Sequence, residues 1–283
     1  MSSRAVWKRR VGAVCAAAAL GLLVAGGSSA PGARAEEPVT LRIASYNVLG
    51  DVHTAPYEHD DEFAPSRIRA EWMADVLTRM GGPDIVGLQE VQAAQLKAIM
   101  RATGDRYAAW PADKVPGGGP QSLLWDKSVW QATDKQTISI PFITGQRPQP
   151  VVRLRHLATG REIWVLNVHN APAELQGQRN VAVSREIAKI LELRATGLPV
   201  FLLGDMNEKT TVFCKVVGQT DLISPLGGSA GPSGCKPPTA RMRVDWLFLS
   251  EDVTVDSFAM YQSPLKSWST DHVTIPVAGV TLP

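Results

Sequence analysis

The sequence predicts one mixed α+β domain, and three observations lead to this prediction. Segments with the pattern of strands outnumber segments with helical periodicity. No linker or break in composition divides residues 36–283. The 283 residues are 45% hydrophobic and 20% charged, which is typical of a globular protein and sufficient for a sizeable core. A disordered chain and a fibrous protein are therefore excluded.

The first half of this domain contains most of the expected strands. Alternating or continuously apolar segments predict strands at 40–47, 84–90, 122–126, 136–142, 150–157 and 162–169. A polar loop is expected at 50–65. Apolar residues at helical spacing from Ile68 to Met80 predict a helix, which Gly81-Gly82-Pro83 ends. A second helix is expected to begin near Ala93.

The second half begins with a long predicted helix at about 174–195, which ends at Gly197-Leu198-Pro199. Further strands are predicted at 200–203, 243–248 and 273–277. Between the first two of these strands lie Cys214 and Cys235, in a region rich in Gly, Ser and Pro. Neither cysteine has a neighbouring Cys or His at the spacing of zinc ligands, so we expect a structural disulfide in an oxidising compartment.

The first 35 residues have the layout of a secretory signal peptide. Four basic residues precede an uncharged run of fifteen residues from Val11 to Ala25, and Ala33-Arg34-Ala35 forms an A-x-A cleavage site. The run is short for a membrane-spanning helix, so no stable membrane insertion is expected. We therefore predict cleavage near Ala35 and secretion of residues 36–283.

The expected cleavage changes the charge of the protein. The full chain has 29 basic and 27 acidic residues; residues 1–35 hold five of the basic residues and no acid, which leaves 24 basic residues and a net charge of −3. A strongly cationic clamp for nucleic acid or membranes is therefore not supported by overall charge. A net charge of −3 is still compatible with a local basic groove.

Acids, amides and histidines occur at the ends of the predicted strands or beside them. They are Asn47, Glu90, His169, Asp205, Asn207, Asp245, Asp271 and His272. Polar groups flanked by apolar strand residues are costly unless they are paired or bound to a metal, and the strand ends of a layered sheet protein can meet at one edge. Hard oxygen donors with two imidazoles and no thiolate suit Mg²⁺ or Mn²⁺ better than zinc. These residues predict metal-assisted hydrolysis of a phosphoester.

Six segments together resemble the endonuclease/exonuclease/phosphatase superfamily, which includes deoxyribonuclease I. In family order they are Ser45-Tyr46-Asn47-Val48, Pro83-Asp84-Ile85-Val86-Gly87-Leu88-Gln89-Glu90-Val91, Asn167-Val168-His169, Gly204-Asp205-Met206-Asn207, Arg243-Val244-Asp245-Trp246-Leu247 and Thr270-Asp271-His272. The resemblance spans residues 43 to 278 and implies a four-layer α/β/β/α sandwich of two mixed sheets with outer helices. Residues 36–283 are then one catalytic domain.

The resemblance also implies a role for each residue of the site. The implied metal ligands are Glu90 as the principal one, with Asn47 and Asp271. The implied catalytic residues are His169, Asp205, Asn207, Asp245 and His272. Asp205 and Asn207 position the attacking water and the phosphate, and Asp245 orients His272. Either Asp205 or His272 is the general base, and the sequence leaves this choice open.

The chain departs from the family pattern at several positions. Deoxyribonuclease-like members place an acid behind the second histidine, where this chain has Gly and Pro in residues 117–121, so His169 has no evident carboxylate partner. Gln92 replaces an arginine, Leu49 replaces the acid of abasic-site nucleases, and Thr270 replaces a serine. The catalytic set is complete, but these differences weaken the case for DNA as substrate.

The predicted function is that of a secreted Mg²⁺-dependent phosphodiesterase or phosphomonoesterase, with Mn²⁺ as an alternative ion, and the protein is expected to be a monomer. Nucleic acid ranks first among the substrates, followed by phospholipid head groups of the sphingomyelinase kind and by sugar or inositol phosphates. The alternative from another class is a secreted binding protein on the same scaffold, but a complete catalytic set argues against it. A serine esterase built on Gly227-Gly228-Ser229-Ala230-Gly231 lacks the flanking strand and helix of that motif.

The polar loop at 50–65 contains a further group of acids and histidines. His53, His59, Asp60, Asp61 and Glu62 are close together in the sequence and can be interpreted as a second metal site. We interpret the segment instead as a solvated loop at the rim of the site.

Overall fold

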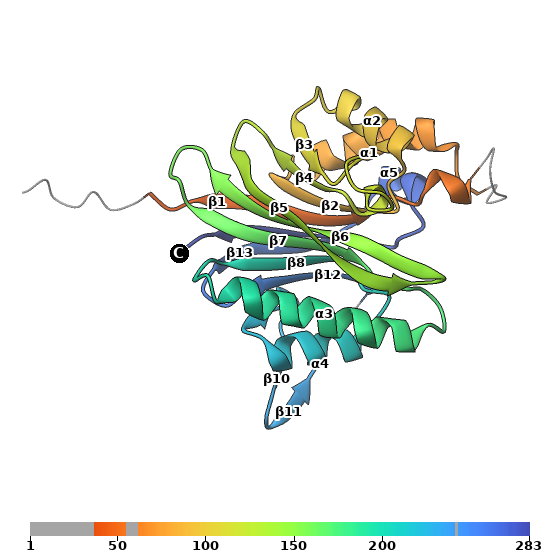
Figure 1. Ribbon diagram of the computed structural model, residues 1–283. Coiled ribbons are helices and arrows are strands. Elements are labelled where there is room, and N and C mark those ends of the chain that lie inside the picture. Colours follow the sequence, from red (N-terminus) through yellow and green to blue (C-terminus); the bar gives the residue numbers. More distant parts are fainter. Residues whose placement is uncertain (1–36, 55–61, 241–242) are drawn as a thin grey trace, which may run out of the picture. The chain divides into compact units, whose positions relative to one another are not determined.

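The computed structural model describes residues 37–54, 62–240 and 243–283, and the predicted signal peptide lies outside these residues. The described chain forms two six-stranded mixed sheets with helices on their outer faces (Figure 1). In spatial order, the first sheet consists of β13 (Thr254–Tyr261), β14 (Ile275–Thr281), β1 (Thr40–Asn47), β2 (Ile85–Gln89), β4 (Leu123–Asp126) and β3 (Tyr107–Trp110). The second sheet consists of β5 (Trp130–Phe142), β6 (Gly145–His156), β7 (Glu162–His169), β8 (Val200–Asp205), β12 (Asp245–Ser250) and β9 (Leu222–Ile223).

Five α-helices of the described residues cover the two sheets. The outer face of the first sheet carries α1 (Ser66–Arg79), α2 (Ala93–Ala102) and α5 (Pro264–Ser269), and the outer face of the second carries α3 (Gln176–Arg194) and α4 (Thr210–Gln219). Two short 3₁₀ helices, η1 (Asp51–His53) and η2 (Gly119–Gln121), lie in loops. A small hairpin of β10 (Ser229–Gly231) and β11 (Gly234–Lys236) projects beside α4 (Figure 1). This is the predicted α/β/β/α sandwich, so the fold prediction is confirmed.

The alternation of side chains along the strands produces three apolar layers. In β1, Leu41 and Ile43 pack between the two sheets, whereas Ala44 and Tyr46 pack under the helices of the first sheet. The second sheet is also buried on both faces: Leu203 packs between the sheets while Leu202 packs under α3 and α4. Burial of both faces explains why β2 and β8 read as continuous apolar runs in the sequence.

The parallel strand pairs bring the site residues to one edge. β1 pairs in parallel with β2, and β7 pairs in parallel with β8, so Asn47 and Glu90 end one pair while His169 and Asp205 end the other. Asp245, the first residue of β12, lies opposite Asp205 in the antiparallel ladder between β12 and β8. Backbone pairing alone therefore gathers these polar residues at the same end of the sandwich.

One glycine and a buried amide join the two sheets close to this edge, and a second glycine fixes the backbone within the second sheet. A Cβ atom at Gly87 would lie 1.9 Å from the side chain of Leu203 and 2.4 Å from that of Asn167, so glycine is needed where the sheets approach. The Asn167 amide donates to the carbonyl oxygens of Leu88 and Gln121, each at 2.8 Å. Gly204 has a φ of +148° and passes the Val168 carbonyl so closely that a Cβ would lie 2.0 Å from its oxygen. Asp205 thus follows a tightly fixed backbone.

Most of the predicted elements are present, and several shorter elements were not predicted. The structure confirms the helix ended by the glycines after Met80, the long helix at 176–194 and the disulfide, which joins Cys214 of α4 to Cys235 of β11. The elements missing from the sequence prediction are β3, β9, β10, β11, β13, α4 and α5. Ser229 is exposed and begins strand β10 instead of a strand-to-helix turn, which excludes the serine-hydrolase elbow. Among the described helices, none is long and apolar enough to cross a membrane.

Candidate active site

A cleft of about 410 Å³ lies at the edge where these strands end. Six of the predicted site residues line it, namely Glu90, His169, Asp205, Asn207, Asp271 and His272. Asn47 and Asp245 lie beneath the lining and bond to residues in it. The rest of the wall consists of Val52, His53, Gln92, Pro120, Phe142, Ile143, Arg147 and Pro172. All eight predicted residues therefore belong to one cleft or to its immediate support.

Glu90 follows β2 with a positive φ of 61°, an uncommon conformation for a residue with a side chain. Its carboxylate accepts hydrogen bonds from the Asn47 amide at 2.9 Å and from the Gly50 backbone N–H at 3.1 Å. His53 Nε2 lies 3.2 Å from its second oxygen. Burial alone would raise the pKa of Glu90, but the contact with His53, the charge of His169 and the Asn47 bond lower it well below its usual range. Glu90 is therefore an anionic carboxylate held in a fixed orientation.

Asn47 links the carboxylates of the two sheets. Its amide nitrogen donates to Glu90 and also to Asp205 Oδ2, at 3.1 Å. Its amide oxygen accepts the Leu49 backbone N–H at 3.0 Å. Asn47 thus holds Glu90 and Asp205 at a fixed separation, and its oxygen is engaged by the turn that follows β1.

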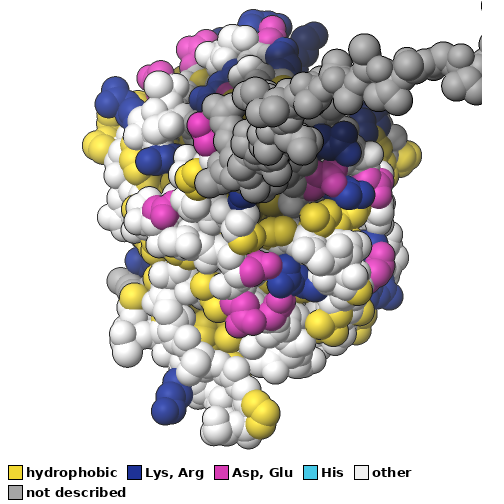
Figure 2. All heavy atoms as spheres, turned by 90° about the vertical axis from the view of Figure 1, so that its left-hand side faces the viewer, with side chains coloured by type: hydrophobic (Ala, Val, Ile, Leu, Met, Phe, Trp, Pro, Cys, Tyr) yellow, Lys and Arg dark blue, Asp and Glu magenta, His cyan; other side chains and the backbone are white. Residues whose placement is uncertain are grey.

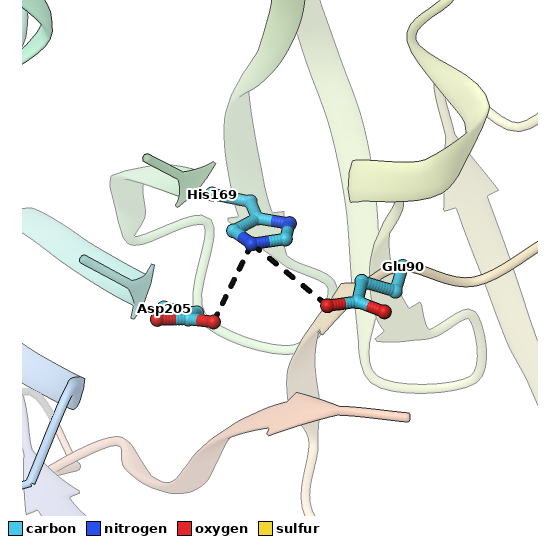
Figure 3. Close-up of side chains that lie close together, drawn as sticks. All are labelled: Glu90, His169 and Asp205. Carbon is cyan, nitrogen blue, oxygen red and sulfur yellow. Dashed lines mark ion pairs between the residues drawn. The ribbon is translucent and has the colours of Figure 1, made fainter. Parts of the chain in front are cut away.

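His169, at the end of β7, lies between the same two carboxylates. Its Nε2 is 3.4 Å from Asp205 Oδ2 and 3.9 Å from Glu90 Oε1, and Figure 3 shows the two carboxylates on either side of the imidazole. The edge of the ring packs on Phe142, with centroids 5.1 Å apart. Its buried Nδ1 has no hydrogen-bond partner among the described residues, in agreement with the missing acid at 117–121. Burial lowers the pKa of His169, and the neighbouring carboxylates oppose this only in part.

Asp205 is 2% exposed and lies at the centre of the site. In addition to Asn47 and His169, its Oδ2 is 3.5 Å from His272 Nε2. Its other oxygen accepts the backbone N–H of Asn207 at 2.9 Å, and the Asn207 side chain donates to the Asn170 carbonyl at 2.9 Å. Burial raises the pKa of Asp205, while the two imidazoles oppose the rise. A carboxylate with a raised pKa is a stronger base than a solvated one.

His272 and Asp245 form an acid–imidazole pair. His272 Nδ1 lies 2.8 Å from Asp245 Oδ2, and the other oxygen of Asp245 has no hydrogen-bond partner among the described residues. Burial alone would lower the pKa of His272, but the charge of Asp245 and the bond to it raise the pKa to about 10, with help from Asp205. Lys266 Nζ donates to the backbone carbonyl of His272 and fixes the segment. In this state His272 is an imidazolium that presents Nε2 to the cleft.

Asp271 lies at the mouth of the cleft and is exposed. One of its oxygens accepts a weak bond from the Thr270 hydroxyl at 3.4 Å, and that hydroxyl also donates to the backbone carbonyl of Asn47 at 2.8 Å. Threonine at position 270 therefore ties the Asp271-His272 segment to the end of β1.

Two cleft residues were not identified as site residues in the sequence. Arg147, in β6, lines the cleft with its guanidinium 3.4 Å from the centroid of the Phe142 ring, and its charge acts on both Glu90 and His169. Arg147 lies inside a strand, whereas the polar residues that the sequence singles out lie at strand ends or beside them. His53 was predicted to lie in a rim loop, which agrees with its position, but the structure also places it against Glu90. Of the other candidates of that loop, Glu62 is exposed and does not line the cleft, and His59, Asp60 and Asp61 lie outside the described residues.

The carboxylates of the cleft are partnered by amides and imidazoles. Within the described part of the chain, no lysine or arginine forms an ion pair with Glu90, Asp205 or Asp245. Two groups of ligand atoms lie within 4.8 Å of one another, Glu90–His169–Asp205 and Asp205–Asp245–His272. A donor set of carboxylate oxygens and imidazole nitrogens suits a divalent cation. The cleft can therefore hold a cation and a phosphate together, beside groups able to transfer protons.

Comparison with known families gives one match that covers most of the chain. Residues 44–272 match the model of the endonuclease/exonuclease/phosphatase family. No curated protein sequence matches the chain.

Solved structures with the same fold include three informative relatives. An endonuclease/exonuclease/phosphatase family protein from Bacteroides thetaiotaomicron has a TM-score of 0.65 at 16% identity and covers 87% of this chain and 99% of its own. A mannosyl-6-phosphatase from the same species has a TM-score of 0.64 at 17% identity, with 86% and 100% covered. D. rerio TDP2 complexed with a single-strand DNA product has a TM-score of 0.64 at 19% identity, with 85% and 98% covered. At these identities the similarity establishes the fold.

Proposed function

Because the chain belongs to the endonuclease/exonuclease/phosphatase family and is a phosphoesterase of that family, we propose that it is a secreted, metal-dependent phosphodiesterase. The observation that carries the proposal is the position of Asp205, whose Oδ2 lies within 3.5 Å of both imidazoles and is held by Asn47 beside Glu90. This arrangement supplies an acceptor and donors of protons on either side of a phosphate.

The residues of the cleft fit a divalent cation. Glu90 is the principal ligand in the proposal, with Asp271 at the mouth, and Asn47 acts mainly by holding the Glu90 carboxylate. Glu90 is anionic and free of basic partners other than imidazoles among the described residues, so its charge remains available to a cation. Mg²⁺ or Mn²⁺ bound there supplies Lewis-acid polarisation of a phosphoryl oxygen.

The remaining residues of the site handle protons and charge. Asp205 accepts the proton of the attacking water, because burial makes it the stronger base and His272 already carries a proton. Asn207 fixes one oxygen of Asp205 through its backbone N–H. His272, oriented by Asp245, donates a proton from Nε2 to the phosphate or to the leaving oxygen, and His169, whose pKa burial lowers, donates a hydrogen bond from Nε2. In this proposal Asp205 is therefore the general base, the choice that the sequence leaves open.

Nucleic acid remains the first substrate to test. Phe142, Pro120 and Ile143 offer apolar surface on the cleft wall against which a base can stack, and Arg147 can pair with a phosphate. Within the described lining, Arg147 is the single guanidinium, which suits a short or single-stranded substrate better than a long duplex. A phosphomonoester is the second candidate, since one guanidinium and one metal suffice for a single phosphate.

Export is part of the proposal and rests on residues 1–35 alone. Expression of the full chain in a bacterial host with N-terminal sequencing of the product tests it. A mature protein in the periplasm or medium that begins near Glu36 is expected. A full-length product kept in the cytoplasm would contradict it.

The activity is tested with bis(p-nitrophenyl) phosphate as substrate. We expect turnover with Mg²⁺ or Mn²⁺, none with EDTA, and a loss of about 10³-fold in kcat for His272→Ala. His156→Ala is the matched control, because His156 lies in β6 outside the cleft and its Nδ1 bonds to Thr159. Equal turnover with and without EDTA, or a fully active His272→Ala variant, would overturn the proposal. DNA, RNA and phosphomonoesters then rank the substrates.

A further inference from the structure

His53 lies directly against the carboxylate that is proposed to hold the metal. Its Nε2 is 3.2 Å from Glu90 Oε2, and both side chains line the cleft. We propose that His53 is a nitrogen ligand of this metal site and gives it a preference for a first-row transition ion, such as Mn²⁺, over Mg²⁺. This inference rests on the proposed function and concerns which ion the same cleft selects.

The distance between the two atoms already matches that of neighbouring ligands on one ion. Two adjacent ligand atoms of an octahedral ion, each bound at roughly 2.1 Å, are about 3 Å apart. His53 Nε2 and Glu90 Oε2, at 3.2 Å, are close to this separation. A cation can therefore be bound by both with little rearrangement of either side chain.

The segment that carries His53 is fixed on both sides. Before it, the Gly50 N–H donates to Glu90 Oε2 at 3.1 Å, and the Asp51 N–H donates to the Gln95 side chain at 3.0 Å. After it, Thr54 is buried and its hydroxyl accepts from the Arg69 guanidinium at 3.2 Å. The short helix η1 thus presents His53 from a backbone that is bonded to the site itself.

Arg69 donates several hydrogen bonds that hold the segment carrying His53 in place. It is a fully buried guanidinium that ties together the turn after β1 and the end of α5. Besides Thr54, its acceptors are the backbone carbonyl oxygens of Val48, Leu49, Ala64 and Ser269, at 2.8 to 2.9 Å. A histidine needed only as part of a solvated rim would not require a loop held in this way. The anchoring pre-organises the imidazole for a ligand.

The chemistry of the donors decides which ion is preferred. Carboxylate oxygens alone favour Mg²⁺, whereas an imidazole nitrogen favours transition ions. His53 Nε2 faces one oxygen of Glu90, and His169 Nε2 lies 3.9 Å from the other. Glu90 is thus flanked by imidazoles on both sides, and a mixed nitrogen and oxygen set is available on its cleft side.

Isothermal titration of the protein with Mn²⁺ and separately with Mg²⁺ tests the proposal. In His53→Gln we expect the Kd for Mn²⁺ to rise about tenfold or more, while the Kd for Mg²⁺ rises less than about threefold. His156→Gln, which removes a histidine of the second sheet outside the cleft, is expected to leave both values unchanged. An equal change for the two ions in His53→Gln, or no change for Mn²⁺, would overturn the proposal.

Pulsed electron paramagnetic resonance of bound Mn²⁺ gives a readout independent of affinity and activity. Coordinated imidazole produces a ¹⁴N modulation, which we expect to be weaker in His53→Gln than in the unsubstituted protein and in His156→Gln. The same modulation in all three proteins would show that His53 is not a ligand. If Glu90→Ala still binds both ions, or the unsubstituted protein binds neither, the proposed function fails as well. If Glu90→Ala loses metal binding while His53→Gln binds both ions like the unsubstituted protein, the inference about His53 is wrong and the proposed function stands.

Discussion

The two ends of strand β2 carry one acid each, and the two acids have different partners. At its start, Asp84 accepts the Arg42 backbone N–H at 2.7 Å and lies in the field of the Arg106 guanidinium. At its end, Glu90 is held by an amide, a backbone N–H and two imidazoles. The same contrast holds for the two ends of the sandwich. Figure 2 shows the end opposite the cleft, where acidic and basic side chains lie next to one another.

The ion pairs at that opposite end involve guanidinium groups. Arg106 donates to Asp126 at 2.6 Å, and Arg194 pairs with Asp221 at 2.6 Å and with Asp252 at 3.0 Å. A guanidinium remains charged at every ordinary pH and neutralises its partner, so these acids are left with little capacity to bind a cation. Imidazoles and amides orient the carboxylates of the cleft without neutralising them permanently. The nature of the partner therefore separates structural acids from acids available for chemistry.

The strongest test of this comparison replaces one acid at each end of β2. Glu90→Gln is expected to lower kcat by about 10³-fold with bis(p-nitrophenyl) phosphate, because it removes the proposed metal charge while preserving shape. Asp84→Asn is expected to leave kcat within about twofold, because its partner groups lie outside the cleft. Steady-state kinetics with circular dichroism of both variants provides the measurement. Similar losses in the two variants would show that partner type does not distinguish the acids.

The second test compares two arginines, Arg147 in the cleft and Arg106 at the opposite end of the sandwich. Arg147→Ala is expected to lower kcat/KM by about 30- to 100-fold, because Arg147 is the guanidinium in the described cleft lining and can form charge-assisted bonds to a phosphate. Arg106→Ala is expected to leave kcat/KM unchanged and to lower the melting temperature. Arg147→Lys should recover only part of the loss, since an ammonium cannot form a bidentate bond. An unaltered kcat/KM in Arg147→Ala would remove Arg147 from substrate binding.

The strand pattern of the sequence was sufficient for the fold but not for all of its helices. Alternating and continuous apolar runs predicted the central strands correctly. A strand buried on one face has alternating apolar residues, and a strand buried on both faces is apolar throughout. α4 was missed because Thr210, Thr211 and Gly218 disfavour a helix locally. It is stabilised by tertiary contacts, with Val212 and Phe213 in the core of the second sheet and Cys214 in the disulfide. Such contacts cannot be read from a local window.

The same limit applies to the site. Polar residues at strand ends pointed to the eight residues that the structure gathers at one edge, and their catalytic roles stay predictions. Arg147 was not predicted as a site residue, because the face of the sheet on which its side chain lies is set by the pairing of Arg147 with Ile140 between β5 and β6. The contact of His53 with Glu90 joins residues 37 positions apart and depends on the anchoring by Arg69. Local sequence supplies the chemistry, whereas long-range packing decides which groups meet.

Glu186 is a third kind of acid, because it is buried and has no basic partner in the part of the chain that the structure describes. Glu186 of α3 is 0% exposed, and burial raises its pKa to about 8, which the amide of Asn170 opposes only in part. Between its ordinary pKa of 4.5 and about 8, the unfolded chain releases this proton while the folded protein keeps it, so stability falls as the pH rises. We expect the free energy of unfolding to fall by about 3 kcal/mol more between pH 5 and pH 8 in the unsubstituted protein than in Glu186→Gln.

Urea titrations of the two proteins at a series of pH values measure this difference. Glu192→Gln, an exposed position on the same helix, serves as the control and should follow the unsubstituted protein. Parallel pH profiles for Glu186→Gln and the unsubstituted protein would mean that Glu186 ionises in the folded state as it does in the unfolded chain.

The smallest effect of a substitution is expected for Asp126, which lies at the end of the sandwich opposite the cleft and accepts three hydrogen bonds. Asp126 accepts from Arg106 at 2.6 Å, from the Ser128 backbone N–H at 2.9 Å and from the Ser128 hydroxyl at 2.6 Å. Asp126→Asn retains an oxygen for part of this set and loses the charge, so we expect the free energy of unfolding to fall by about 1 kcal/mol with no change in kcat. Denaturant titration and steady-state kinetics check both halves of the prediction. A fall in kcat without a fall in stability would place a functional acid among guanidinium partners, and partner type would then no longer separate the two ends of the molecule.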